Sequence, residues 1–375
     1  MTLRNELSGG TPVVRGFEKT WREWVGSRYC ITVSNGSMAL YSAFFGVGLG
    51  PGDEFIAPTY TWICSVSGAI MLGARPVFAE SDPDTLMIDP EDVRRRITDR
   101  TRAIVAVHLW GNVCDMDAFA EISRETGVPV IEDCSHAHGA RFGDRPVGTV
   151  GAAGCWSLQG SKPLSAGEGG VLVTDDIDLF ERACVLGQVN RIKGLDLATT
   201  KFEHLQPFGI GMKTRAHPLG IGIAAEQWKK LPDLNARRRA YIEQVEAAMA
   251  DLPGLCPVKA YEKAERAGFY GFPVHHVPAE SGMSTARFVR RLNDLGLPAG
   301  RNAYTPLHSL SIFKDGFDLF TRGRCGLSDD YPGYGEEDFP VTRKALEDVV
   351  FLPLLSDPIP GATNKVIEAL RRAVG

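Results

Sequence analysis

Apolar and polar residues alternate in blocks along the first half of the chain, and these blocks predict strands separated by helices. Short apolar runs predict strands at residues 29–33, 53–57, 75–78, 103–109, 128–132 and 171–173. Apolar residues spaced three and four positions apart predict helices at residues 17–25, 38–47, 61–72, 90–97, 115–126 and 178–186. This alternation is typical of a largely parallel sheet with helical crossovers. We therefore expect an α/β fold whose ligands bind at the carboxyl ends of the strands.

The pattern changes after residue 190. Residues 190–217 have scattered basic and aromatic residues without periodicity, and we expect a long irregular segment there. Loops of this length in a compact domain are usually functional or interfacial. Helices are expected at 219–231, where Pro232 breaks the pattern, and at 235–251.

The last third of the chain has the pattern of a smaller α+β domain. A short strand is expected at residues 269–274, and helices are expected at 285–295 and 364–373. We therefore divide the chain into a large domain, residues 1–235, and a small C-terminal domain, residues 236–375.

Composition and charge are those of an ordinary globular protein. Apolar residues make up 44% of the 375 residues, charged residues make up 23%, and the formal net charge is -5. Because the longest basic runs hold three arginines, neither nucleic acid nor a membrane surface is an expected partner. The sequence shows neither a signal peptide nor an apolar run of membrane-spanning length. Its eight cysteines form no CxxC pair, so we expect a cytoplasmic protein with reduced thiols.

Lys162 stands out for the chemistry that its surroundings allow. It lies in Ser157-Leu-Gln-Gly-Ser-Lys-Pro163, and Gly167-Glu-Gly-Gly170 precedes the next strand. Proline disfavours a helical conformation of the residue before it, so Lys162 is expected on a loop. Such a lysine can form an imine with a carbonyl cofactor, most commonly pyridoxal 5'-phosphate. Taken alone, however, the stretch fits a solvated loop lysine better.

A turn of small residues, Ser34-Asn-Gly-Ser37, connects a predicted strand to a predicted helix. Backbone N–H groups and the positive end of the helix dipole meet there, so the turn is a candidate anion site. An ordinary N-cap by Ser34 or Ser37 explains the same residues equally well.

A third motif, Glu132-Asp-Cys-Ser-His-Ala-His-Gly139, follows a buried strand. A carboxylate at that position, Asp133, can pair with the protonated nitrogen of a pyridine ring. His136 and His138 are possible metal ligands, but no third ligand stands at a recognised metal spacing. We expect no metal, and two buried histidines with satisfied hydrogen bonds are the stronger interpretation.

Together the three motifs resemble the DegT/StrS family of pyridoxal-phosphate-dependent aminotransferases, which act on keto-sugars and keto-cyclitols. The resemblance runs from about Phe17 to the C-terminus, in the order and spacing of the family. It implies the fold of type I aminotransferases, with a mostly parallel central sheet and a smaller C-terminal domain. It also implies a homodimer with shared active sites, an amino-acid donor and a small-molecule keto acceptor.

The resemblance implies a role for individual residues. Lys162 would be the Schiff-base lysine and proton shuttle, and Asp133 would pair with the pyridine nitrogen. The further cofactor contacts that it implies are Gly36, Ser37, Met38 and Ser157 at the phosphate, Trp62 stacked on the ring, His136 near the 3-oxygen, and Ser135 and Gln159 close to these groups.

Two features of the chain depart from the family. Where relatives have Gly-x-Asn-x-Arg, this chain has Lys213 in the place of the asparagine that reaches the phosphate of the neighbouring subunit. A lysine can neutralise a phosphate as a point charge, so the role can persist. The segment before Phe17 is shorter than in most relatives. Tyr304 and His308 match the piece that approaches the substrate, although His308 fits a satisfied histidine equally well.

Because Lys162 is present, the resemblance favours an aminotransferase over the dehydratase branch of the family. The Cys134-Ser-His-Ala-His-Gly139 form and the Ser157-Leu-Gln-Gly-Ser-Lys162 form look most like the cyclitol branch, of the scyllo-inosose type, in antibiotic pathways. That branch implies a ping-pong transfer from glutamine or glutamate to a keto-cyclitol. The alternatives are a nucleotide-linked keto-sugar as acceptor, the branch that makes aminohydroxybenzoate, and a regulatory protein that binds the cofactor without turnover.

Overall fold

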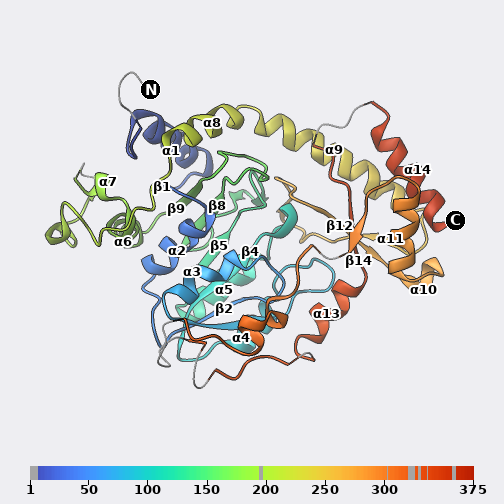
Figure 1. Cartoon of the computed structure of the whole chain (residues 1–375), viewed down its shortest axis with the longest axis horizontal. Coiled ribbons are helices and arrows are strands. Elements are labelled where there is room, and N and C mark those ends of the chain that lie inside the picture. Colours follow the sequence, from blue (N-terminus) through green and yellow to red (C-terminus); the bar gives the residue numbers. More distant parts are fainter. Residues whose placement is uncertain are drawn as a thin grey trace.

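A seven-stranded sheet forms the centre of the molecule (Figure 1). The structure is a computed structural model, and it describes residues 7–193, 197–301, 303–319, 326–327, 331–335, 337–356 and 360–375. In spatial order the strands are β1 (Tyr29–Val33), β9 (Gly170–Thr174), β8 (Ala153–Ser157), β5 (Val130–Asp133), β4 (Thr101–Val107), β2 (Glu54–Pro58) and β3 (Arg75–Ala79). All adjacent strands pair in parallel except β9, which is antiparallel to both of its neighbours. The predicted α/β fold with a mostly parallel sheet is confirmed.

Helices alternate with these strands and continue to the C-terminus. Their bounds are α1 (Pro12–Val25), α2 (Gly36–Gly46), α3 (Cys64–Met71), α4 (Pro90–Arg96), α5 (Met116–Thr126), α6 (Ile177–Gly187), α7 (Val189–Lys193), α8 (Pro218–Trp228), α9 (Leu231–Met249), α10 (Pro278–Ser281), α11 (Thr285–Asp294), α12 (Ser311–Lys314), α13 (Pro340–Glu347) and α14 (Ala362–Val374). Helix α2 packs on β8 and β9 and against α3 and α6. Among the helices described, none has both the length and the apolar character needed to cross a membrane.

A second sheet lies beyond the far end of α9, the long yellow helix along the top of Figure 1. Its strands are, in order, β10 (Leu255–Pro257), β12 (Phe272–His276), β14 (Val349–Leu352) and β13 (Gly300–Arg301), and they pair antiparallel. Side chains of α9, α11 and α14 form a separate core with this sheet. The domain boundary predicted between residues 235 and 236 falls inside α9, and the division into two domains stays a prediction.

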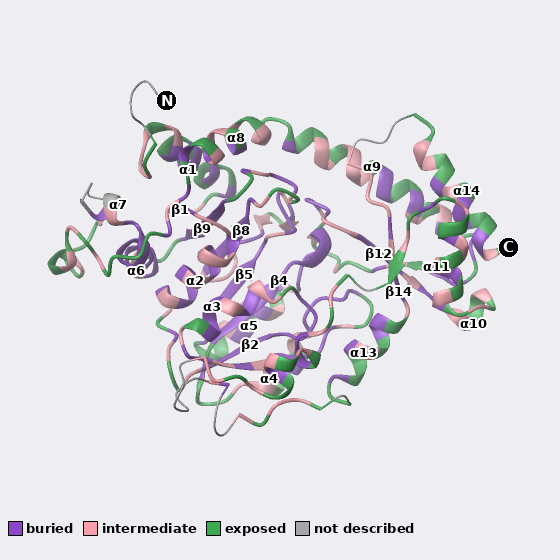
Figure 2. Ribbon diagram, in the orientation of Figure 1, coloured by how far each residue is buried: buried purple, intermediate pink, exposed green. Residues whose placement is uncertain are grey.

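A small third sheet lies beside the large one. It pairs β11 (Ala264–Glu265) with β6 (Arg141–Phe142) and β6 with β7 (Arg145–Pro146), all antiparallel. Burial is concentrated in the large sheet, whose strands are mostly purple in Figure 2. All residues of β2, β5, β8 and β9 are buried, as expected for strands covered on both faces.

Prolines account for two helix boundaries that differ from prediction. Helix α1 begins at Pro12, well before the expected residue 17. Helix α9 begins at Leu231, so Pro232 lies in its first turn and does not simply end the preceding helix. Proline suits a first helical turn because its missing N–H group has no partner within the helix there.

Two predictions about helix starts near the candidate motifs were wrong. Helix α3 begins at Cys64, so Trp62 lies in the loop before the helix and not within it. The N-cap of α2 is neither Ser34 nor Ser37. Instead, Asn35 Oδ1 accepts a hydrogen bond from the backbone N–H of Met38 at 2.9 Å, because an asparagine side chain reaches the free N–H groups of the first turn well.

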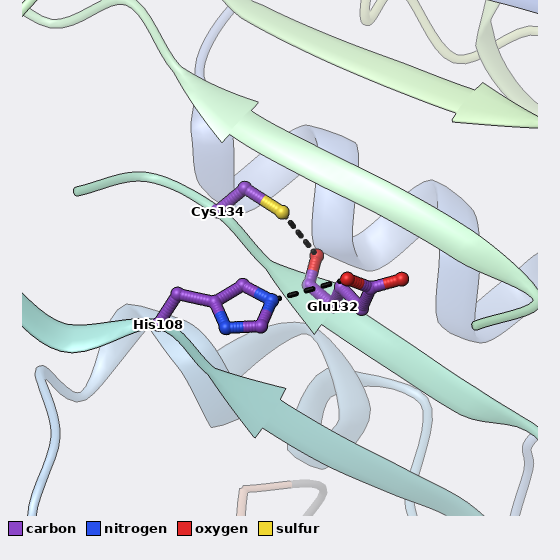
Figure 3. A group of neighbouring side chains, drawn as sticks. All are labelled: His108, Glu132 and Cys134. Carbon is purple, nitrogen blue, oxygen red and sulfur yellow. Dashed lines mark hydrogen bonds and ion pairs between the residues drawn. The ribbon is translucent and has the colours of Figure 1, made fainter. Parts of the chain in front are cut away.

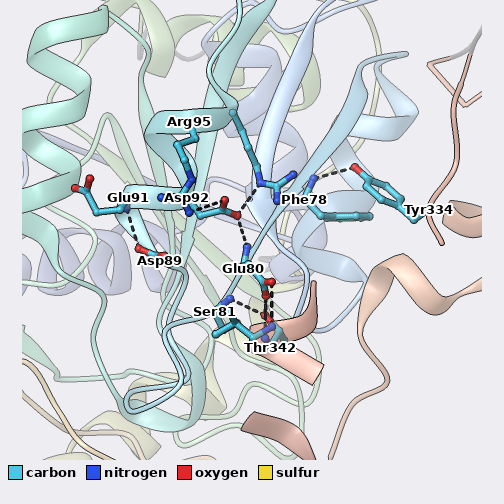
Figure 4. Close-up of polar contacts among 11 residues, drawn as sticks. Phe78, Glu80, Ser81, Asp89, Glu91, Asp92, Arg95, Tyr334 and Thr342 are labelled. Atoms are coloured by element: carbon cyan, nitrogen blue, oxygen red, sulfur yellow. Dashed lines mark hydrogen bonds and ion pairs between the residues drawn. The ribbon is translucent and has the colours of Figure 1, made fainter. Parts of the chain in front are cut away.

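The C-terminal part of the chain packs back onto β3, the edge strand of the large sheet (Figure 4). The buried carboxylate of Glu80 accepts hydrogen bonds from the backbone N–H groups of Val341 and Thr342 and from the Thr342 hydroxyl. The Tyr334 hydroxyl accepts a hydrogen bond from the backbone N–H of Phe78 at 3.0 Å. These contacts cap α13 and cover polar groups of a strand edge that would otherwise face solvent.

Candidate active site

A cavity of about 510 Å³ opens at the carboxyl ends of β4, β5 and β8. Most of the residues predicted to bind the cofactor or substrate line it: Gly36, Ser37, Trp62, Asp133, Ser135, His136, Ser157, Gln159, Lys162 and Tyr304. Strand ends of a parallel sheet converge in this way, so residues far apart in the chain meet at one site.

The first turn of α2 lies directly against the end of β8. A Cβ atom placed on Gly36 would lie 2.7 Å from the Cβ atom of Ser157, so only glycine allows this approach. The Asn35 side chain already bonds the N–H of Met38, which leaves the N–H groups of Gly36 and Ser37 directed along the helix axis. With the Ser157 hydroxyl beside them, these groups fit the phosphate of pyridoxal phosphate.

Asp133 ends β5 and is buried at the floor of the cavity. Its Oδ2 atom accepts a hydrogen bond from the Ser65 hydroxyl at 2.7 Å, and its Oδ1 atom accepts one from the backbone N–H of Ser135 at 3.1 Å. Two donors on different elements therefore fix the orientation of the carboxylate. A carboxylate held in this way can pair with a protonated ring nitrogen.

His108 and Glu132 form a fully buried pair beside Asp133 (Figure 3). His108 Nε2 lies 3.1 Å from Glu132 Oε2, and His108 Nδ1 accepts a hydrogen bond from the backbone N–H of Cys114. The proton of the imidazole is therefore on Nε2 and points at the carboxylate. The Glu132 carboxylate also accepts hydrogen bonds from the backbone N–H groups of Gly148, Val150 and Gly151.

Cys134 lies close enough to this pair to suggest a metal site, because one ligand atom from each of the three residues lies within 4.8 Å of the others. However, the polar atoms of His108 and Glu132 are already engaged in hydrogen bonds. Burial also raises the pKa of the Cys134 thiol, which disfavours the thiolate that a metal needs. The group is therefore a hydrogen-bond network that supports the end of β5.

Lys162 lines the cavity and lies on a loop that hydrogen bonds hold in place. Its backbone N–H donates to the carbonyl of Gln159, and Gln159 Oε1 accepts hydrogen bonds from the N–H and hydroxyl of Ser161. The Nζ atom lies 3.9 Å from the centroid of the Tyr270 ring. Burial lowers the pKa of the Lys162 amine from 10.5 to about 8. A sizeable fraction of the amine is therefore neutral near neutral pH, as a nucleophile or base requires.

His136 lies in a stack of aromatic rings. Its ring centroid lies 4.1 Å from that of Tyr270 and 5.2 Å from that of Trp110. Nδ1 accepts a hydrogen bond from the backbone N–H of Trp110, so the proton of the neutral ring is on Nε2. Burial, and then the charge of Lys162, hold the pKa of His136 well below its usual value. His136 is therefore a neutral hydrogen-bond donor in the site.

Three of the predicted residues do not line the cavity. Met38 only contributes its N–H to the cap of α2. Lys213 is exposed and forms an isolated β-bridge with Gln188. His308 is buried, and its Nδ1 atom lies 2.6 Å from the hydroxyl of Thr59. Their contacts with cofactor or substrate stay predictions.

Sequence reasoning missed Tyr270 and Ser65, which touch Lys162 and Asp133. No spacing rule connects either residue to its partner, because each comes from a different element. Glu168 also lines the cavity. The sequence places it in the glycine-rich motif but predicts no role for it.

Known proteins are similar to this chain in sequence and in fold. The sequence model of the DegT/DnrJ/EryC1/StrS aminotransferase family matches residues 2–371. The L-glutamine:scyllo-inosose aminotransferase of Streptomyces griseus is 35% identical over 324 residues, which cover 81% of this chain and 76% of that protein. The spore coat polysaccharide biosynthesis protein SpsC of Bacillus subtilis (strain 168) is 29% identical over 375 residues, 100% of this chain and 92% of that protein. The structure of an aminotransferase from Psychrobacter cryohalolentis superposes with a TM-score of 0.84 at 27% identity and covers 98% of this chain and 93% of that one.

Proposed function

We propose that this chain, which belongs to the DegT/DnrJ/EryC1/StrS aminotransferase family, transfers the amino group of glutamine to a free keto-cyclitol. Membership of the family makes it a pyridoxal-phosphate-dependent aminotransferase of sugar or cyclitol biosynthesis. The identity of donor and acceptor is the part that we propose.

The charge of the cavity carries this proposal. Among the described residues that line it, Lys162 is the one lysine, and none is an arginine. Asp133 and Glu168 are acidic. A nucleotide diphosphate carries negative charges that proteins usually bind with arginine or lysine. A free cyclitol ketone is neutral, and hydroxyl groups and aromatic faces such as those of Tyr304 and Trp62 suit it better.

The similarity to a glutamine:scyllo-inosose aminotransferase supports the same choice. That relative is 35% identical to this chain over an alignment that covers most of both sequences. Its name specifies glutamine as donor and a free cyclitol ketone as acceptor. A nucleotide-linked keto-sugar is the alternative acceptor, and the same experiment tests it.

Each step of transamination would depend on particular residues of this chain. When bound, pyridoxal phosphate supplies a ring that withdraws electrons from the carbon that loses a proton. The first turn of α2 and Ser157 would hold the phosphate, and Asp133 would keep the ring nitrogen protonated. Lys162 Nζ would remove the proton from the donor and return it to the acceptor, because its lowered pKa suits both directions of transfer.

An acceptor screen tests the proposal. The purified protein, loaded with pyridoxal phosphate, is supplied with glutamine or glutamate and with either free cyclitol ketones or nucleotide-linked keto-sugars. Aminated products are quantified by mass spectrometry, with Lys162→Ala as the inactive control. We expect glutamine and a free cyclitol ketone to give the highest kcat/KM. Faster amination of a nucleotide-linked sugar would show that the alternative is correct.

We propose in addition that the active sites are shared in a homodimer. Large apolar side chains are exposed next to Lys213: Phe208, Ile210 and Met212 are 70%, 54% and 38% exposed. Such a patch is typical of a protein–protein interface. Lys213 points outward with it, where it would reach the phosphate site of a partner subunit.

A further inference from the structure

We propose that Tyr270 is a positioning residue for Lys162, whose free amino group it holds over its aromatic ring while that group is not bonded to the cofactor. This inference rests on the proposed function in one respect, because it takes Lys162 as the reacting lysine. The family resemblance assigned no role to Tyr270, and the contacts of this ring carry the inference.

Tyr270 contacts both the side chain of Lys162 and the loop that carries it. Lys162 Nζ lies 3.9 Å from the ring centroid, well within the range of a cation–π interaction. The Tyr270 hydroxyl lies 2.9 Å from Ser161 Oγ. Ser161 Oγ donates its own proton to Gln159 Oε1, so it accepts the proton of Tyr270. One side chain therefore orients the amine and fixes the loop beneath it.

The backbone segment before Tyr270 is tightly constrained and holds Tyr270 in this position. Phe269, next to it, has a φ angle of 51°, which is unusual for a bulky residue. Gly268 has a φ of 83°, and a Cβ atom on it would lie 2.5 Å from the carbonyl oxygen of His136. Strained backbone of this kind persists where the surrounding structure holds it, and it is concentrated at functional sites.

Helix α9 supplies the groups that hold this segment. Arg238 Nη1 donates to the carbonyl oxygen of Gly268 at 2.7 Å. The backbone N–H of Gly268 donates to Asn235 Oδ1 at 3.2 Å, and Asn235 Nδ2 donates to the carbonyl of His138. The position of Tyr270 is therefore tied to the same strand end that carries Asp133 and His136.

The surroundings of Lys162 explain why an aromatic ring suits this task. Asp133 and Cys64 favour the charged form of the lysine, burial opposes it, and His136 nearby is neutral. Glu168 and Tyr304 also line the cavity. A direct carboxylate partner would hold the lysine proton tightly and keep the amine unreactive. The face of a ring attracts the ammonium more weakly and accepts no proton, so the amine can lose its proton and leave.

The test measures the pKa of Lys162 in the protein without cofactor. The rate at which an amine-selective acylating reagent modifies Lys162 is followed between pH 6 and 10 by peptide mass spectrometry. In Tyr270→Leu we expect the pKa of Lys162 to fall by about 0.4 to 1.5 units, because the attraction of the ring for the ammonium is lost. Tyr270→Phe keeps the ring, and we expect it to retain the wild-type pKa.

Tyr304→Leu is the matched control, because Tyr304 lines the same cavity, whereas the ring beside Lys162 Nζ is that of Tyr270. Its Lys162 pKa should equal that of the wild type. An unchanged pKa in Tyr270→Leu, or an equal fall in Tyr270→Phe, would overturn the inference. If Tyr270→Leu does not fold, the Tyr270→Phe variant alone tests the inference. A fall in the pKa of Lys162 in that variant would show that the aromatic ring does not hold the amine. The measurement needs no acceptor, so it is independent of the acceptor screen.

Discussion

The backbone N–H of Trp110 lies 3.3 Å from Nδ1 of His136, and it donates a hydrogen bond to that nitrogen. Trp110 has a φ angle of 61°, and its ring stacks on that of His136 with an angle of 29° between the ring planes. A strained residue in the turn after β4 therefore fixes the tautomer of a histidine in the loop after β5. The Nε2 proton of His136 is left for a ligand in the cavity.

This relationship predicts the protonation state of His136 over the physiological range. Its pKa is held well below the usual value by burial and then by the charge of Lys162. We expect ¹⁵N NMR of the histidine rings to show His136 neutral and protonated on Nε2 from pH 6 to 8. His136→Asn identifies the resonances. A ring protonated on Nδ1, or one that titrates near pH 6.5, would contradict the geometry.

The pKa of Lys162 predicts how fast the protein takes up its cofactor at each pH. With a pKa of about 8, roughly one amine in ten is neutral at pH 7, against fewer than one in a thousand for an ordinary lysine. The rate of covalent attachment of pyridoxal phosphate, followed by stopped-flow absorbance, should rise about tenfold per pH unit below pH 8 and level off above it. A rate that still rises at pH 10 would show that the amine has an ordinary pKa.

The sequence could predict the cavity residues that lie at strand ends and in small-residue turns, because strand order and turn position determine where these residues lie. Asp133 and Gly36 lie at the ends of strands that the apolar pattern predicts, and these strand ends meet at one edge of the sheet. Ser157 ends β8, a strand that the pattern did not predict, and its role was implied only by the family resemblance. Nothing in that pattern locates Tyr270, which lies 109 positions beyond Ser161 and reaches it through a strained connection. Long-range contacts of this type depend on packing between elements, and periodicity does not encode packing.

The same limit explains His308. Its place in a motif predicts a substrate contact, which stays a prediction, and in the structure its ring packs on Phe339 and its Nδ1 bonds Thr59. Only the fold shows that these two partners surround it. Motif position predicts which segment approaches a site but not which way a side chain turns.

Glu132 is expected to stabilise the fold at neutral pH. Burial alone would raise its pKa, but the hydrogen bond from His108 and those from the backbone N–H groups of Gly148 and Gly151 hold that pKa below 4.5. Glu132→Gln keeps the shape and should lower the free energy of unfolding by about 2–4 kcal/mol at pH 7, because His108 loses its charged partner. Urea unfolding measures the change, and the exposed Glu23→Gln is the control.

The pH dependence of that difference follows from the sign of the shift. A carboxylate with a lowered pKa stabilises the folded state above its unfolded pKa, near 4.5, and loses this contribution as the pH falls through the folded value. The stability difference between wild type and Glu132→Gln should therefore be constant from pH 8 to 6 and shrink below pH 4.5. A difference that grows in acid would contradict the assignment.

The contact between Glu80 and Thr342 is expected to hold the C-terminal part of the chain on the large sheet. Thr342→Val removes a hydroxyl that donates to Glu80 at 2.5 Å and accepts from the N–H of Ser81 at 2.7 Å. We expect a loss of about 1–3 kcal/mol in the free energy of unfolding and faster proteolysis near α13. In a double-mutant cycle with Glu80→Gln, the two changes should not be additive. Additive effects would show that the two residues act independently.

Mixing two inactive or weakened variants tests whether sites are shared. If Lys213 serves the phosphate site of the partner subunit, Lys213→Ala should weaken pyridoxal phosphate binding about 10- to 100-fold, because a charged hydrogen bond is lost. Lys162→Ala should be inactive. A mixed dimer of the two variants would contain one site with both lysines intact. Random reassociation should restore about a quarter of the wild-type sites at low cofactor concentration. No recovery, with mixed dimers demonstrated by mass spectrometry, would place Lys213 in the site of its own subunit or outside both.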